Sequence, residues 1–275
     1  MLNELHFAGW TDVDDSWEWD PRAIQWKMAL SNWFERRLRV AVGGSRSTPS
    51  AEARRLLALD GPSVSGHLAE SGTVEQLAAS MIARSPYQGK EADPHTFVIP
   101  RVAGSVKRVL CEIQAGEYGV GHARSHAELF ADALVGLDLD PTPNAHIDAC
   151  DGPSLATSNL VALGLQRRLR GVVLGQLALF EMDSVVPNSR MVDCCDRLGL
   201  PDGVRRFFQI HVLADAEHEV LAEQAFLVDF PEAEPDQVDE LLLGMRAQSL
   251  IDRRVAASFV PSWEADSATL LSAVS

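Results

Sequence analysis

The sequence predicts an all-α protein, and three observations carry that prediction. Apolar residues recur at three- and four-residue spacing through most of the 275 residues. Runs of alternating β-branched residues are nearly absent, and no Asn-Gly or Asp-Gly turn separates two strand-like runs. Proline and small polar residues stand where the periodic stretches start and stop. We therefore expect a single helical domain over residues 1–275.

Eight amphipathic stretches are expected to form helices, and several carry their own boundary signals. They cover residues 21–42, 49–58, 73–84, 104–136, 154–182, 188–198, 202–229 and 234–259. Pro49 suits the first turn of the second helix, and Pro187 follows the end of the fifth. Asp202 suits the N-cap of the seventh helix, and Pro235 the first turn of the eighth. Residues 85–100 and 138–153 are expected as loops, and 264–275 as a loosely held tail.

The charge balance limits the partners that this chain can have. Lys and Arg number 24 against 39 Asp and Glu, which gives a formal charge of −15. Nucleic acids and anionic membranes call for a basic footprint, so we expect neither as a partner. The N-terminus is acidic and lacks the features of a signal peptide, and no apolar run approaches the roughly 20 residues of a membrane span. Four cysteines without CxxC spacing complete the expectation of a cytoplasmic protein with free thiols.

The stretch HVLADAEHEV, residues 211–220, places polar groups on an apolar helix. At about 100° per residue, His211, Asp215 and His218 fall within roughly 60° of one another. Phe, Leu, Val and Ala surround them, so the three side chains are expected to be buried. A buried carboxylate and two imidazoles without partners would cost several kcal/mol. Either a metal ion or polar groups of a neighbouring helix must satisfy them.

Glu181 is a second candidate, in GVVLGQLALFEMDSVVP. It ends an apolar stripe near a predicted helix C-terminus. That end of a helix disfavours an anion, which argues for a compensating cation. The alternative is a glutamate that reaches solvent.

The third candidate segment, LCEIQAGEYGVGHARSHAELF, combines acids, histidines and glycines. It contains Glu112, Glu117, His122 and His126. Glu117 and His126 are nine residues apart, which puts them on opposite faces of an unbroken helix. They can share a metal only if the helix breaks or bulges at Gly119 or Gly121. In an unbroken helix Glu112 would lie beside His126 instead, and the spacing alone leaves both arrangements open.

Taken together, EYGVGHARSHAELF, GQLALFEMDSVVP and HVLADAEHE resemble the three signature segments of the iron-containing redox enzyme family, the haem-oxygenase-like di-iron oxidases and oxygenases. ADPHTFVIPRVAG and SLATSNLVALGLQRRLRG extend the resemblance more weakly, to about residues 80–230. It implies a haem-oxygenase-like bundle of about seven core helices that holds two iron ions and no haem. The ligands that it implies are Glu117, His126, Glu181, His211, Asp215 and His218. Glu112 and His122 fall outside the motif as possible neighbours, and the first 70 residues match nothing.

The donor set is consistent with iron on chemical grounds. Imidazole and carboxylate suit iron, whereas a structural zinc site would normally bring thiolates. Three carboxylates against two Fe(II) ions would leave a net charge of about +1, and six side chains leave coordination positions open. Ferritin-like bundles use Glu-x-x-His pairs, which this sequence lacks. A haem would need only a proximal histidine, which would leave the buried acids without a purpose.

The resemblance implies an enzyme that activates O2, and the substrate is less defined. We expect a small nitrogen-containing molecule, with N-oxygenation in specialised metabolism as the leading reaction. Arg167 and Arg170 stand on the Glu181 side of their predicted helix, where they could clamp a carboxylate. The alternatives are oxidative C–C or C–H cleavage or desaturation of an amino acid or fatty acid, and a non-catalytic protein that binds iron or a small ligand. An external electron donor and a homodimer are compatible with each enzymatic alternative.

Overall fold

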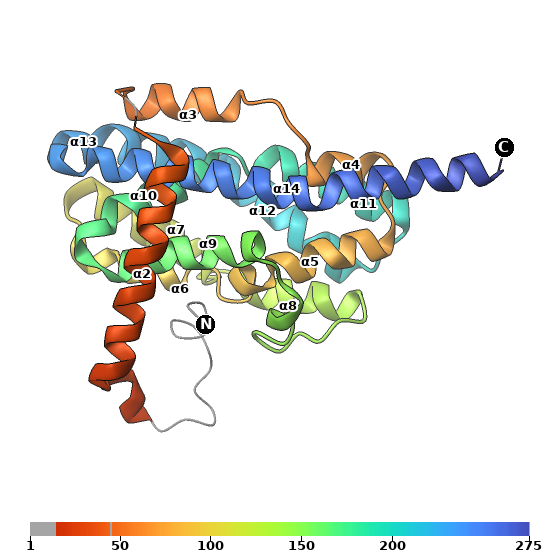
Figure 1. Ribbon diagram of the computed structural model, residues 1–275, viewed down its shortest axis with the longest axis horizontal. Coiled ribbons are helices and arrows are strands. Elements are labelled where there is room, and N and C mark those ends of the chain that lie inside the picture. The colour runs from red at the N-terminus through yellow and green to blue at the C-terminus, as the bar shows by residue number, and fades with distance from the viewer. Residues whose placement is uncertain (1–14, 45, 275) are drawn as a thin grey trace.

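The computed structural model describes residues 15–44 and 46–274, with side chains from residue 16 to 265 apart from Ser45. The described chain is helical almost throughout and contains no strand, so the all-α prediction is confirmed (Figure 1). The principal helices are α2 (Pro21–Val42), α3 (Pro49–Leu57), α4 (Val64–Glu70), α5 (Val74–Gln88), α6 (Asp93–Thr96), α7 (Gly104–Glu117), α8 (His126–Gly136), α9 (Gly152–Ala162), α10 (Arg170–Met182), α11 (Val185–Leu198), α12 (Asp202–Ala222), α13 (Phe230–Ala233) and α14 (Val238–Val274).

The differences from the predicted helices lie at glycines, prolines and short elements. The predicted helix 104–136 is divided into α7 and α8, and 154–182 is divided by short 3-10 turns over residues 163–169. Helix α5 passes Pro86 and ends only at Gln88. Helices α4 and α6 were not expected, and residues 264–274 continue α14 as helix where we expected a loose tail. A π-helical segment, η6 (Glu223–Asp229), follows α12.

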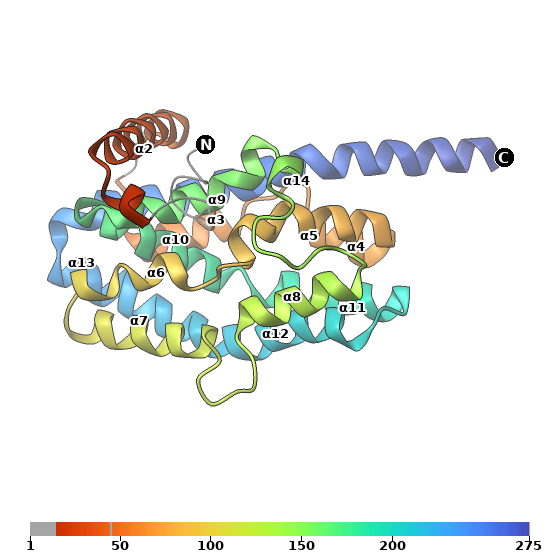
Figure 2. The ribbon, with the colours of Figure 1, turned by 90° about the horizontal axis from the view of Figure 1, so that it is seen from below.

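Helix α10 forms the centre of the bundle. Every residue from Gly171 to Leu179 is buried, because GVVLGQLAL is apolar nearly all round. It packs against α14 along most of its length and against α12 on another side. Figure 2 shows α7, α8, α11 and α12 together along the lower side of the bundle, with α14 running along the opposite side. None of the described helices is long and apolar enough to cross a membrane.

Glycines allow α10 and α14 to approach closely. A Cβ atom on Gly244 of α14 would lie 1.9 Å from the Val172 carbonyl oxygen, and one on Gly175 would lie 2.0 Å from that of Leu241. Both distances are far below van der Waals contact, so the two backbones touch where only glycine fits. This contact fixes the position of α10 and of the Glu181 side chain at its end.

Helix α2 stands apart from the remainder of the fold. It leaves the bundle at a steep angle, and its N-terminal half points away from the other helices (Figures 1 and 2). Its C-terminal half is attached by Leu38, which joins an apolar cluster with α10 and α14. Ion pairs from Glu35 to Arg168 and from Arg39 to Glu240 add to this attachment. The first half of α2 is therefore held mainly by its own helical hydrogen bonds.

Replacing Gly244 with alanine should destabilise the protein. The added methyl group meets a backbone carbonyl, so α14 must shift, at a cost of about 1–3 kcal/mol or more. Chemical denaturation of the purified variant measures this loss. Gly152→Ala is the matched control, because nothing lies within 4 Å of a Cβ at that position. Equal stability of the two variants would contradict the close α10–α14 approach.

Candidate metal centre

Helix α12 presents His211, Asp215 and His218 on one buried face, as the spacing predicts. The Nδ1–H of His211 donates to the Phe207 carbonyl oxygen at 2.7 Å, which turns the Nε2 atom of His211 toward the centre of the bundle. The Ser184 hydroxyl donates to Asp215 Oδ2 and holds that carboxylate in place. Hydrogen bonds of this kind orient metal ligands in proteins.

The chain between α7 and α8 breaks at the glycines, and this brings Glu117 to His126. Gly119 has a φ of +73°, and a Schellman motif ends α7, with Val120 N–H donating to the Ala115 carbonyl oxygen at 2.8 Å. Helix α8 then starts at His126, capped by Ser125 in a capping box with Glu128. The Glu117 Oε2 and His126 Nδ1 atoms lie 2.7 Å apart. The broken helix is therefore the arrangement that this chain adopts.

Glu181 joins the same cluster from the end of α10. Its Oε2 atom lies 3.4 Å from His218 Nδ1, and Glu117 Oε1 lies 3.5 Å from that nitrogen. Asp215 Oδ1 is 3.8 Å from it. A Cβ on Gly116 would come within 3.1 Å of His218 Nε2, so the absence of a side chain there makes room for the imidazole. The six residues named from the sequence thus form one buried group.

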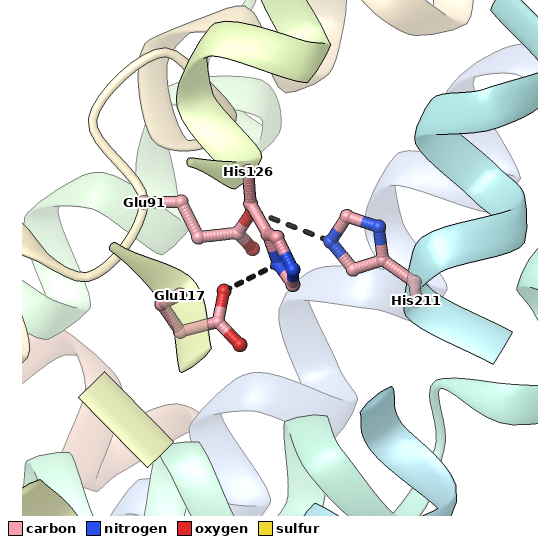
Figure 3. Close-up of side chains that lie close together, drawn as sticks. All are labelled: Glu91, Glu117, His126 and His211. Carbon is pink, nitrogen blue, oxygen red and sulfur yellow. Dashed lines mark hydrogen bonds and ion pairs between the residues drawn. The ribbon is translucent and has the colours of Figure 1, made fainter. Parts of the chain in front are cut away.

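A seventh residue, Glu91, was not predicted from the sequence. It lies in the turn between α5 and α6, is buried, and places its Oε2 atom 3.4 Å from His211 Nε2 (Figure 3). Ala92 beside it has a φ of +79°, and the Gln114 side chain donates to the Ala92 carbonyl oxygen at 2.5 Å. Helix α7 therefore holds the turn that carries Glu91.

Glu91 is hard to identify from the sequence because its surroundings resemble a solvated loop. It stands between Lys90 and Ala92 in a segment rich in polar residues, and Pro86 indicated that the preceding helix had ended. The segment that resembles the family weakly begins one residue later, at Ala92. The one signal in the sequence is Glu91 itself, a charged residue directly before this segment.

Six of the seven side chains, all except Asp215, can hold metal in two overlapping groups. Ligand atoms of Glu91, Glu117, His126 and His211 lie within 4.8 Å of one another, and so do those of Glu117, Glu181 and His218. Glu117 belongs to both groups. Glu117 Oε2, His126 Nδ1 and His218 Nδ1 are buried but have no hydrogen-bond partner of suitable geometry. Glu117 Oε2 and His126 Nδ1 are close without a well-aligned hydrogen bond, and buried acceptor atoms left in this state fit a site that holds metal.

The electrostatics of the cluster reflect burial of like charges. Burial and the neighbouring carboxylates raise the pKa of Glu117 well above its usual value and that of Asp215 to about 7. Burial also lowers the pKa of His126 to about 4, which keeps its imidazole neutral. Burial also tends to lower the pKa of His211. The Glu91 carboxylate outweighs this effect and raises the pKa of His211 to about 9. Without metal, the cluster retains protons that bound cations would displace.

The structure does not bring the two candidate arginines to the cluster. Arg170 forms an ion pair with Glu234, and Arg167 is exposed in the turn before α10. Arg170 stands eleven residues before Glu181, roughly 16 Å along the helix axis. Glu112 and His122 instead line a cavity of about 290 Å³ that reaches His126 and His218. They are neighbours of the cluster without being part of it.

Comparison with known proteins adds a family and a fold. A family model described as "Iron-containing redox enzyme" matches residues 79–252. Two crystal structures of a CADD-like protein of unknown function from Nostoc punctiforme PCC 73102 share the fold. One has 19% identity and a TM-score of 0.58 and covers 77% of this chain and 96% of that one; the other has 18% and 0.56 and covers 78% and 95%. A search of curated proteins finds no match.

Replacing Glu91 with glutamine should weaken metal binding at one of the two positions. The substitution keeps the shape of the side chain but removes the charge beside His211, so iron content should fall from about two ions per chain toward one. Metal analysis after anaerobic Fe(II) loading and desalting gives the stoichiometry. Glu112→Gln is the control, because it removes an exposed carboxylate near the cluster. Two tightly bound ions in the Glu91 variant would exclude this residue as a ligand.

Replacing Gly119 with alanine should lower iron content although no ligand changes. A Cβ there would lie 2.4 Å from the Arg124 carbonyl oxygen, and the left-handed backbone costs a further 1–2 kcal/mol or so. The Glu117 side chain is then displaced from His126. Gly121→Ala separates the two effects, since its φ is also positive at +85° but nothing lies within 4 Å. A larger loss of iron in the Gly121 variant would contradict the role given to the Gly119 contact.

Proposed function

Because the chain belongs to the iron-containing redox enzyme family, we propose that it is an O2-activating di-iron oxygenase that acts on a small nitrogen-containing molecule. N-oxygenation in specialised metabolism, in the cytoplasm, is the reaction that we favour. Two iron ions and O2 are the cofactor and co-substrate of this proposal, without haem. An external electron donor would return the irons to the ferrous state between turnovers.

The observation that carries this proposal is the set of unpartnered buried atoms around Glu117. Four carboxylates, those of Glu91, Glu117, Glu181 and Asp215, lie within one buried cluster. Burying like charges together is strongly unfavourable without compensation. Two divalent cations would balance the four negative charges, and Glu117 belongs to both groups of residues that would hold them. The donor set of carboxylates and imidazoles suits iron.

When bound, two ferrous ions supply the electrons that activate O2. The protein's own residues then position the ligands and exclude water. Phe207 fixes His211 through its carbonyl group, and Ser184 fixes Asp215. All seven ligand side chains are less than one-tenth exposed, so solvent reaches the ions poorly from the bundle side. A substrate would therefore reach the cluster through the adjoining cavity beside His126 and His218.

The cavity beside His126 and His218 supports a nitrogen-containing substrate. Its volume of about 290 Å³ suits a molecule of few heavy atoms. Glu112 and Glu217 line it and would attract a protonated amine or guanidine toward the cluster. Arg206 also lines it and forms no ion pair among the described residues, so it can receive a carboxylate. An amino acid or a similar zwitterion matches both signs of charge.

Substrate-dependent O2 consumption by the ferrous protein tests the proposed function. Amines, amino acids and fatty acids are added in turn to protein loaded anaerobically with Fe(II), and O2 uptake and product mass are measured. We expect an amine or amino acid to stimulate uptake and to gain one oxygen atom on nitrogen. A product that has lost hydrogen or carbon without gaining oxygen would indicate desaturation or cleavage. Protein that binds iron but consumes no O2 with any compound would favour a binding function.

Replacing Arg206 with glutamine should raise the KM for a carboxylate-bearing substrate by about tenfold, while kcat changes little. One charge-assisted hydrogen bond is worth roughly 1.5–3 kcal/mol. Arg205→Gln is the matched control, because the neighbouring Arg205 pairs with Asp196 instead of lining the cavity. Steady-state O2 uptake gives both constants. Equal effects of the two substitutions would place the substrate carboxylate elsewhere.

A further inference from the structure

Helix α2 carries a stripe of exposed apolar residues at seven-residue intervals. Trp26, Trp33 and Val40 are 59%, 56% and 81% exposed. Trp19, a further seven residues back and just before the N-cap Asp20, is 77% exposed. In an α-helix, residues seven apart drift by only about 20° per interval. The stripe therefore runs along one side of α2 from its tip to its last turn.

This stripe lies away from the side by which α2 contacts the bundle. The buried residues in the second half of α2 are Ser31, Glu35 and Leu38. They lie roughly 140–200° around the helix from Trp33. The N-terminal half of α2 projects from the other helices (Figures 1 and 2), where it contacts the 3-10 turn η1 (Asp15–Trp19), and Trp26 and Trp33 remain more than half exposed. Large exposed apolar patches of this kind mark interaction sites.

The exposed area is of the size that a stable dimer uses. The three tryptophans of the stripe, Trp19, Trp26 and Trp33, leave roughly 480 Å² of aromatic surface uncovered. Val40 and the side chains beside the stripe add to this. A specific interface of standard size uses about 800 Å² per partner. The stripe and its borders thus supply most of one partner's share.

The spacing of the stripe is symmetrical about its middle. We propose that α2 pairs antiparallel with α2 of a second copy of this chain, about a two-fold axis between residues 29 and 30. Trp26 of one copy then faces Trp33 of the other, and Val40 faces the tip at Trp19. A two-fold axis requires such a self-complementary surface. If residue i of the first copy contacts residue j of the second, then residue j of the first copy also contacts residue i of the second. Heptad spacing is also the pattern by which two helices pack along a shared seam.

The charges at the two ends of α2 favour this antiparallel arrangement. Glu18 lies before the helix start, and Arg36 and Arg37 lie near its end, where neither arginine forms an ion pair among the described residues. In the proposed register Arg37 faces Arg22, whose charge is paired with Asp20 of its own chain, and Glu18 lies roughly 6–8 Å along the axis from Arg36 and Arg37 of the other copy. A parallel pair would place like charges together at both ends. Charge complementarity of this kind selects orientation more than it adds affinity.

The oligomeric state of the full chain tests the proposed pairing. Sedimentation or light scattering at micromolar concentration should show a dimer for the unchanged protein, with or without iron. The double variant Trp26→Glu/Trp33→Glu should be monomeric, because buried carboxylates would oppose each other across the seam. Val135→Glu, which alters an exposed residue on α8, should remain dimeric. Circular dichroism must show the same helical content in all three proteins.

Engineered cysteines test the register, in a Cys111→Ser background because Cys111 is an exposed thiol. Oxidised Trp26→Cys/Trp33→Cys should form a covalent dimer, since position 26 of one copy faces position 33 of the other. Each single variant should not, because its two cysteines stand seven residues apart along the seam. That separation of roughly 10 Å exceeds the span of a disulfide.

Three outcomes would overturn the proposal. A monomeric unchanged protein would show that the stripe does not pair with a second copy. A dimer that survives the double glutamate substitution would place the interface elsewhere. Cross-linking of the single cysteine variants would indicate a parallel pair. None of these results depends on the proposed oxygenase function, because the dimer requires neither iron nor substrate.

Discussion

The burial of four carboxylates in one small volume is the constraint on which the remaining structure depends. Glu91, Glu117, Glu181 and Asp215 come from four different segments, and each is almost fully shielded from water. Burial, together with their mutual repulsion, raises the pKa of Glu117 and Asp215 in the absence of a cation. Cations bound among these groups would offset this cost, which is the physical basis of the proposed metal site. The helices around the cluster are arranged to hold its carboxylates in place.

Each segment is held by a local device that suits its position. Glycine contacts with α14 fix the position of helix α10. They therefore also fix the position of Glu181 near the end of α10. The Schellman motif at Gly119 turns the chain back so that α8 can begin at His126. Gln114 holds the Ala92 carbonyl oxygen, so the helix that ends at Glu117 also anchors the turn that carries Glu91. Two ligands of the cluster thus depend on one helix, α7.

The sequence predicted the parts of the site that lie on regular helices. The stripe His211, Asp215 and His218 follows from helical periodicity alone, whereas the spacing of Glu117 and His126 left open whether the helix breaks at the glycines or Glu112 lies beside His126. Arg170 shows the limit of this reasoning. Helical periodicity places it on the same side of the helix as Glu181, but its ion-pair partner, Glu234, lies 64 residues away in the chain. Side-chain pairing across distant segments leaves no local pattern in one sequence.

The position of Glu91 shows why a residue in an irregular turn is harder to predict from the sequence. Leaving Glu91 out also changes the charge balance of the cluster. Its position depends on a positive φ at Ala92 and on a hydrogen bond from another helix, neither of which has a periodic signal. With three carboxylates, two Fe(II) ions would leave a charge of about +1 in the core; with Glu91 as the fourth, the balance is neutral. A neutral cluster costs less to bury than a charged one, because desolvation penalises net charge most. A fourth carboxylate would therefore make a buried ferrous site less costly, and it comes from a segment that the sequence presents as a loop.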